Sequence, residues 1–383
     1  MFKNITYLDY TTTIPTDSLG VEAILPFLND NFAKSSSSHH FDQRVNEKVK
    51  VNQTRKLIGD FINAEPNELI FTSGATESIN IDLKGDTENY SVKGKYIVTV
   101  STEHYAVLNT CKHLETKGYE TTYLSVSREG LIDLDELKNS LRTDNILVCV
   151  MYVNNETGII QPIKEIASIA HEKGALFMTY ATQAAEKIEI DFDALEIDIM
   201  CLSDHKMYAP KGIGALYVKQ CFNKVKLPPF THSGGHERGV RSKTLNILGI
   251  IAIAKDCEVA QREMNQNSER ITELRDELEN ELLKISGAFL NEIKENRIYN
   301  TINICFPNVD ANVLIGRMKK VAVSNGSACT SAVVEPSHVL KAMGLSENDA
   351  FASLRISLGR FITKEDIKSF VKLQKSELML IYS

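Results

Sequence analysis

The feature of this sequence that most restricts its fold is the alternation of short apolar segments with amphipathic ones from residue 67 to residue 219. Seven segments are nearly continuously apolar, which is typical of strands in a sheet covered on both faces. The helical patterns between them, such as 105–118 and 163–174, end in glycine, a common helix C-terminal signal. The alternation predicts an α/β domain with a mixed, mostly parallel sheet and crossover helices. The predicted strands are 67–74, 95–100, 120–126, 145–153, 175–180, 198–203 and 214–219.

The pattern changes near residue 256. Residues 256–284 form one long amphipathic pattern, and the shorter helical and strand patterns after it resemble a small α+β unit. A chain of 383 residues is long enough for two domains. We therefore expect a large domain over residues 16–256 and a small domain built from residues 1–15 and 257–383.

The charge and the cysteines narrow the class of protein. The net charge of −7 argues against a direct nucleic-acid partner, because such proteins usually carry a basic surface. The longest apolar run, residues 245–254, is too short to span a bilayer and is predicted to form a buried helix. The N-terminus lacks a signal-peptide pattern. The seven cysteines are scattered without a C-x-x-C pair, so neither a disulfide framework nor a metal site is predicted. These features are typical of a cytoplasmic protein without membrane contacts.

In sheets of this kind, ligands bind outside the carboxyl ends of the strands. Residues 73–76, with the sequence SGAT, follow the first strand and open a helix, where backbone N–H groups can hold a phosphate. Lys206 directly follows the sixth predicted strand; such a lysine usually extends to solvent, but a desolvated amine can form a Schiff base. Ser203 and His205 lie on one side of the chain next to it and can hold phosphate oxygens. Together these residues predict bound pyridoxal phosphate joined to Lys206.

Three further residues are candidates. His104 follows the second strand and is either a helix-cap residue or a group that stacks on the cofactor and moves protons. Cys329 lies among small and hydroxylic residues in "SNGSACTS" (324–331), which is typical of an exposed loop, so it is either an incidental surface thiol or a sulfur nucleophile. Arg355 lies in a short predicted strand and either forms a surface ion pair or binds a substrate carboxylate.

Together, these stretches resemble the NifS/IscS cysteine desulfurases of the class V aminotransferase group. The resemblance covers nearly the whole chain, and its motifs occur in the family's order. It implies a fold-type I pyridoxal-phosphate-dependent transferase that acts as a homodimer. It also implies conversion of L-cysteine to L-alanine, with a persulfide that passes to a sulfur acceptor or scaffold protein, as in iron–sulfur cluster assembly. The motifs are "YLDY", "IFTSGATESIN", "STEHYAVLNTC", "VNNETGIIQPI", "SDHKMYAPKGIGALYV", "GGHERGVRSKTLN", "SNGSACTS" and "SLRISLGRF".

The resemblance implies a role for each matching residue. Lys206 is the Schiff-base lysine, His104 stacks on the ring and transfers protons, and Cys329 attacks the substrate sulfur. Arg355 holds the substrate carboxylate, and Asn155 faces both the cofactor and the substrate. The remaining residues hold the cofactor, mainly at its phosphate: Ala75, Thr76, Gln183, Ser203, His205 and, from the other subunit, Thr244.

The sequence departs from the family pattern at the cofactor site. The family has V-D-A-T-Q where this chain has Thr179 to Gln183, so Tyr180 replaces the aspartate that contacts the pyridine nitrogen. A phenol is neutral at pH 7 and stabilises a protonated pyridine less than a carboxylate does. The loss of one buried charge-assisted contact costs about 3–5 kcal/mol, or about two to three decades in rate. Lys243 replaces a glycine next to Thr244, and Asp204 replaces a small residue before His205.

Three functions are consistent with these residues. The first is a cysteine desulfurase whose activity is altered or reduced by Tyr180. The second is a desulfurase-like scaffold or sulfur acceptor that does not bind the cofactor productively. The third is another pyridoxal reaction that needs less electron withdrawal by the ring, such as racemisation or β-elimination. The final destination of the sulfur stays open: an iron–sulfur cluster, tRNA, DNA or a cofactor.

Overall fold

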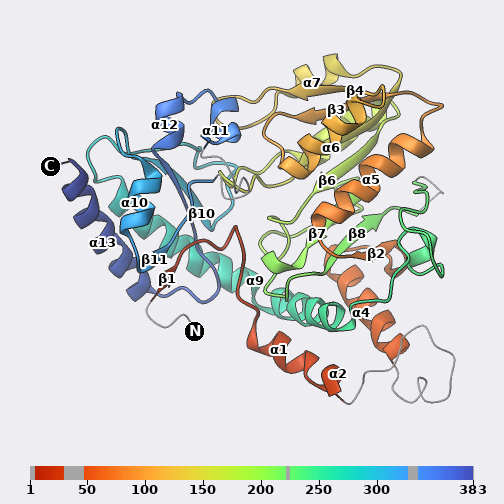
Figure 1. Cartoon of the computed structure of the whole chain (residues 1–383), viewed down its shortest axis with the longest axis horizontal. Helices are drawn as coiled ribbons and strands as arrows, with labels where there is room; N and C mark the ends of the chain where they lie inside the picture. Colours follow the sequence, from red (N-terminus) through yellow and green to blue (C-terminus); the bar gives the residue numbers. More distant parts are fainter. Residues whose placement is uncertain (1–4, 30–46, 221–224, 327–334, 383) are drawn as a thin grey trace.

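The computed structural model describes residues 5–29, 47–220, 225–326 and 335–382. Figure 1 shows a large part that holds the long sheet and a smaller part that holds a short sheet, joined by one long helix. The long sheet has the order β2-β8-β7-β6-β5-β3-β4, and only β8 runs against its neighbours. The predicted mixed, mostly parallel sheet is therefore confirmed. Its strands are β2 (Leu69–Thr72), β8 (Gly214–Val218), β7 (Ile199–Ser203), β6 (Leu176–Tyr180), β5 (Asn145–Met151), β3 (Tyr96–Val100) and β4 (Glu120–Leu124).

Both faces of the long sheet are covered, which explains why its strands are apolar throughout. Along β7, Ile199 and Cys201 pack in one hydrophobic cluster, whereas Met200 and Leu202 pack in another on the opposite face. This follows from the two-residue alternation of a strand. One face is covered by α5 (Ala75–Asn89) and α6 (Tyr105–Glu115), and the other by α4 (Glu47–Ile62), α7 (Leu134–Ser140), α8 (Ile163–Glu172) and the first turns of α9 (Ile247–Leu282). Helices α1 (Ser18–Ile24) and α2 (Pro26–Asn29) also contact α9.

The two helices predicted over residues 245–254 and 256–284 form one continuous helix, α9. It starts at Ile247, because the apolar run 245–254 continues into the amphipathic pattern without a break. Asn246 caps this start, and its side chain accepts a hydrogen bond from the Gly249 N–H at 3.2 Å. A single helix thus crosses from the large part to the small one, so the domain limits at residues 16 and 256 stay a prediction.

The small part contains a three-stranded antiparallel sheet of the order β12-β10-β9, with strands Ser353–Ser357, Thr301–Cys305 and Phe289–Leu290. The N-terminal strand β1 (Thr6–Tyr7) pairs in parallel with β11 (Val321–Ala322), and Asp9 bridges to Ser357. Residues 6–9 therefore belong to the small part, together with residues from the last third of the chain. The helices of this part are α10 (Ala311–Arg317), α11 (His338–Ala342), α12 (Glu347–Phe351) and α13 (Lys364–Tyr382). Among the described residues, no helix combines the length and apolar character needed to cross a bilayer.

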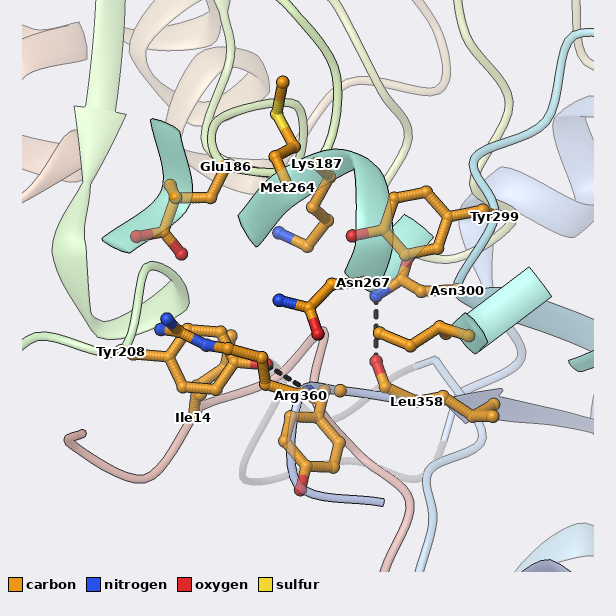
Figure 2. Close-up of a pocket in the computed structure, with 14 residues that line it drawn as sticks. Ile14, Glu186, Lys187, Tyr208, Met264, Asn267, Tyr299, Asn300, Leu358 and Arg360 are labelled. Carbon is orange, nitrogen blue, oxygen red and sulfur yellow. Dashed lines mark hydrogen bonds between the residues drawn. The ribbon is translucent and has the colours of Figure 1, made fainter. Parts of the chain in front are cut away.

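A small cavity of about 30 Å³, lined by both apolar and polar residues, lies where the N-terminal segment, α9 and the ends of β10 and β12 meet. Figure 2 shows that the side chains of Glu186, Lys187 and Asn267 extend into it. The buried Lys187 amine has no hydrogen-bond partner among the described residues. Burial lowers the pKa of Lys187 to about 8, although Glu186 opposes the shift. A cavity of this size and polarity has room for ordered water.

Helix α5 carries two carboxyl groups that make no compensating contact. Asp82 and Asp86 are four residues apart, so they lie on one face of the helix, and both are fully buried. None of their four carboxyl oxygens has a hydrogen-bond partner among the described residues. Burial raises the pKa of both groups well above the usual range, and Asp198 adds to the shift. Both carboxyl groups therefore destabilise the folded state.

We predict that Asp82→Ala and Asp86→Ala each raise the free energy of unfolding at pH 7 by about 1–3 kcal/mol, the usual cost of a buried unpaired polar group. Because the folded-state pKa is raised, the wild type loses stability as the pH rises above about 4, the unfolded-state value, and the variants lose less. Urea denaturation at pH 5 and pH 7 measures both effects. The control is Asp60→Ala, in an exposed pair with Lys56, which should change stability by under about 0.5 kcal/mol. A loss of stability in both core variants would contradict the prediction.

A second prediction concerns Lys187. A lysine with a lowered folded-state pKa binds fewer protons when folded, so its contribution to stability rises with pH between about 8 and 10. Between pH 7.5 and pH 10 the wild type should gain about 2 kcal/mol relative to Lys187→Met. Lys56→Met, at an exposed position on α4, is the control and should follow the wild type. Equal pH dependence in wild type and Lys187→Met would refute this assignment.

Candidate active site

The largest group of predicted site residues meets at one edge of the long sheet. The carboxyl ends of β3, β5, β6 and β7 lie at this edge because these strands are parallel. Strand β2 ends here too, because it is antiparallel to β8, which is antiparallel to β7. A cavity of about 350 Å³ opens there between the two parts of the molecule. Nine of the predicted residues line it: Ala75, Thr76, His104, Asn155, Tyr180, Ser203, His205, Lys206 and Arg355.

One end of the cavity has the character of an anion site. Gly74 is the N-cap of α5 and contributes no side-chain cap, so the cavity faces the first backbone turn of the helix. Its φ angle of 145° favours glycine, and a Cβ on the neighbouring Gly214 would overlap the Gly74 backbone. On the other side, Ser203 Oγ lies 2.9 Å from His205 Nδ1. Hydroxyl groups beside a helix N-terminus are suited to bind a phosphate.

Glu77 fixes this end of the cavity, a role that sequence reasoning did not assign. Its carboxylate accepts two hydrogen bonds from the Arg241 guanidinium, at 2.8 and 3.0 Å, and one from the Ser73 N–H. Burial alone would raise the pKa of Glu77, but these hydrogen bonds lower it below its usual value. Glu77 thus connects the start of α5 to the segment that carries Thr244. Its place in the first turn of a helix was the available signal, because acidic residues are favoured there.

The two predicted catalytic groups in the cavity come from different strand ends. Lys206 is the last residue of a short 3-10 helix, Asp204–Lys206, that follows β7, and it is buried. His104 is the N-cap of α6, and its Nδ1 accepts a hydrogen bond from the Ala106 N–H at 3.0 Å. Burial lowers the pKa of His104 to about 4, and Lys206 and His338 add to the shift. The ring is therefore neutral at pH 7, with its hydrogen on Nε2.

Tyr180 occupies the end of β6, as the sequence predicts. It is buried, and its ring centroid lies 5.7 Å from that of His104, with the two planes tilted by 45°. The next residues are buried too, and Thr182 Oγ1 has no hydrogen-bond partner among the described residues. A cofactor ring stacked on His104 would therefore lie next to the Tyr180 phenol at the end of β6.

Arg355 is buried, so it does not form the surface ion pair that was one of its two predicted roles. It lies in β12, is 2% exposed, and holds three segments together. Its Nη1 donates to the Asn155 carbonyl oxygen at 2.9 Å, and its Nη2 donates to Asp9 at 2.9 Å and to Thr12 Oγ1 at 2.5 Å. Its Nε has no hydrogen-bond partner among the described residues. A substrate carboxylate at this place would share the guanidinium with Asp9.

Three predicted residues lie elsewhere. The Gln183 side chain does not line the cavity; its Nε2 donates to the Thr11 carbonyl oxygen at 2.9 Å, behind the cavity wall. Thr244 is exposed on its own subunit. Cys329 lies outside the described residues, although Gly326, three residues before it, lines the cavity.

The residues present fit pyridoxal phosphate in most respects. The α5 turn with Ser203 and His205 suits its phosphate, a buried amine suits its aldehyde, and the neutral His104 ring suits stacking. The exception is the end of β6, where Tyr180 supplies no carboxylate for the ring nitrogen. The fold and the cavity together define an α/β enzyme with a site for a phosphorylated cofactor beside a lysine.

The comparisons with known proteins agree with this class. The model of the aminotransferase class-V family matches residues 6–370, so the chain belongs to that family. It is 44% identical over 374 residues to the cysteine desulfurase IscS of Histophilus somni, covering 97% of this chain and 92% of the relative. It is 45% identical over 373 residues to the cysteine desulfurase IscS of Methylobacillus flagellatus, with the same coverage. The predicted family is thereby confirmed.

Solved structures give the same result for the fold. A NifS-like protein superposes with a TM-score of 0.91 at 31% identity, covering 98% of this chain and 100% of that chain. A structure described as SspA in complex with cysteine superposes with a TM-score of 0.82 at 35% identity, covering 92% and 98%. The predicted fold of the pyridoxal-phosphate-dependent class is confirmed.

Proposed function

We propose that the protein is a pyridoxal-phosphate-dependent cysteine desulfurase that converts L-cysteine to L-alanine and leaves a persulfide on Cys329. The observation that carries the proposal is the meeting of Lys206, His104 and Arg355 in one cavity at the first turn of α5. The desulfurase names of relatives about 44% identical over 97% of the chain support the same activity. The bound cysteine of a similar structure supports cysteine as the substrate.

The cofactor supplies an aldehyde that joins to amines and a ring that withdraws electrons from the substrate. The chain supplies the rest. The Cys329 thiolate attacks the substrate sulfur, the C–S bond breaks with its electron pair going to the substrate Cβ, and that carbon takes up a proton. One sulfur atom thus moves from the substrate to Cys329, and alanine remains. No external oxidant or reductant is needed.

Each residue in the cavity has a proposed role in this reaction. The Lys206 amine attaches the cofactor and exchanges protons with the substrate. The neutral His104 stacks on the cofactor and holds a hydrogen on Nε2. Arg355 and Asn155 orient the substrate carboxylate. The cofactor is held by Ala75, Thr76, Tyr180, Ser203, His205 and the partner copy's Thr244, whereas Gln183 supports the cavity wall through Thr11.

We also propose that two copies form a homodimer. Thr244 is exposed on its own subunit, and Arg241 anchors its segment to Glu77 at the edge of the cavity. A second copy would bring its Thr244 to the cofactor phosphate. The dimer would pass sulfur to an acceptor protein in the cytoplasm.

Reconstitution with pyridoxal phosphate tests the activity. We expect a visible absorption band and alanine formation from L-cysteine for the wild type. Lys206→Ala should abolish both, whereas Cys329→Ser should keep the band and lose nearly all alanine formation, because only the sulfur acceptor is removed. Cys221→Ser is the control thiol and should behave as the wild type. A protein that stays colourless and forms no alanine would contradict the proposal and favour the second candidate.

That second candidate is a desulfurase-like scaffold or sulfur acceptor without catalysis, and Tyr180 is the observation that favours it. If Tyr180 only weakens an enzyme, Tyr180→Asp should raise alanine formation by about two decades, because a buried carboxylate restores an interaction worth about 3–5 kcal/mol. Steady-state kinetics of the reconstituted proteins measure the change. Tyr180→Phe is the matched control, since it keeps the ring and adds no carboxylate. Equal rates for Tyr180→Asp and the wild type would show that this position does not limit the reaction.

A further inference from the structure

The turn that follows β5 contacts the small part through several hydrogen bonds. The turn consists of residues 154–160 and includes Asn155 of the cavity. Four hydrogen bonds between the turn and the small part fix its position. The donor–acceptor pairs are Arg355 Nη1 to Asn155 O at 2.9 Å, Asn303 Nδ2 to Glu156 O at 3.0 Å, Ile298 N to Gly158 O at 2.8 Å, and Ile160 N to Asn296 O at 2.7 Å, the last donated by the turn itself. The turn is thus held rigidly at the domain junction.

The side chain of Glu156 extends from this turn into the small part. It is 4% exposed, and its Oε2 accepts a hydrogen bond from Ser337 Oγ at 2.5 Å. The same hydroxyl caps α11, because it accepts a hydrogen bond from the Leu340 N–H at 3.1 Å. Glu156 therefore fixes the start of α11.

Gly326 lies against the same carboxyl group. Its φ angle of 87° favours glycine, and a Cβ at this residue would overlap Glu156 Oε2. Its N–H donates to Ser324 Oγ at 3.2 Å, and Ser324 pairs with Arg355 through two backbone hydrogen bonds. The backbone of Gly326 is thus seated between β12 and the Glu156 carboxyl.

One oxygen of Glu156 thus bonds to Ser337 and lies against Gly326, two residues that lie on either side of residues 327–334. Burial raises the pKa of this carboxyl, while His338, the Ser337 hydrogen bond and Arg355 oppose the shift. Whatever its charge, the carboxyl retains an acceptor oxygen for Ser337. Three residues of extended chain span at most about 11 Å, so the place of Gly326 limits the positions that the Cys329 thiol can reach.

We propose that Glu156 is a positioning residue that fixes both ends of the segment carrying Cys329 against the cavity. This inference rests on the proposed function only for the role of Cys329 as sulfur acceptor. Without the Glu156 contact, both flanking ends lose a shared fixed point. We then expect the Cys329 thiol to react less often with the substrate and more readily with an added alkylating reagent.

Two readouts on the reconstituted protein, with Cys221 replaced by serine, test the proposal. The five described cysteines are buried, so alkylation by iodoacetamide reports on Cys329. Glu156→Ala should raise the alkylation rate at least threefold and lower kcat for alanine formation about tenfold, with KM for L-cysteine changed less than twofold. Glu156→Gln, which keeps the size and an acceptor oxygen, should restore both values to within about threefold of the wild type.

Ser337→Ala removes the donor of the hydrogen bond to Glu156 Oε2. Ser346→Ala is its matched control. Ser346 caps α12 as Ser337 caps α11, each helix having five residues, but its hydroxyl bonds to Asp349 and not to Glu156. Ser337→Ala should shift both readouts in the direction of Glu156→Ala, and Ser346→Ala should shift neither. The effects of Glu156→Ala and Ser337→Ala should not add in the double variant.

The outcomes separate the two proposals. Equal alkylation rates in wild type, Glu156→Ala and Ser337→Ala would overturn the positioning role, as would a fall in kcat matched by an equal loss of cofactor absorption. If the wild type forms no alanine, the proposed function fails, yet the alkylation rates still decide the role of Glu156. If Glu156→Ala does not fold, Ser337→Ala and Ser346→Ala give the same comparison.

Discussion

The arrangement of the site depends on the hydrogen bonds of Arg355. The guanidinium comes from the small sheet, and it joins Asp9 and Thr12 of the N-terminal segment to the carbonyl of Asn155 in the large part. A buried guanidinium needs partners for its charge and its donors, and the bonds of Nη1 and Nη2 hold the three segments in one relative position. The cavity walls, the turn with Glu156 and the docked N-terminus all follow from this contact.

The sequence predicts the fold and most of the cavity because both depend on local patterns. Buried strands read as apolar runs, and the polar residues that end them must meet at one edge of a parallel sheet. Lys206, His104, Ser203 and Tyr180 were found in this way. Sheet order, by contrast, is not encoded locally. The same holds for the continuity of α9: residues 245–254 and 256–284 are each predicted to be helical, but their patterns do not show that they form one helix.

The residues that sequence reasoning missed act through partners distant in the chain. Glu77 binds Arg241, and Glu156 contacts both Gly326 and Ser337. No single-sequence pattern relates such pairs, since each carboxylate alone resembles an ordinary surface or helix-cap residue. Gln183 shows the converse: its motif predicted a cofactor contact, whereas its amide nitrogen bonds to Thr11 behind the wall. The role of each predicted site residue therefore depends on contacts that form only in the folded chain.

The pairing of β1 with β11, and of Asp9 with Ser357, has a consequence for biosynthesis. Residues 6–9 are synthesised long before their partner residues, which lie more than 300 residues later in the chain. Contacts of such high sequence separation form late in folding. The large sheet can assemble during translation, but the wall that Thr11, Thr12 and Arg355 provide forms only after the small part has been synthesised. A truncated chain would therefore hold the lysine and the α5 turn without a finished cavity.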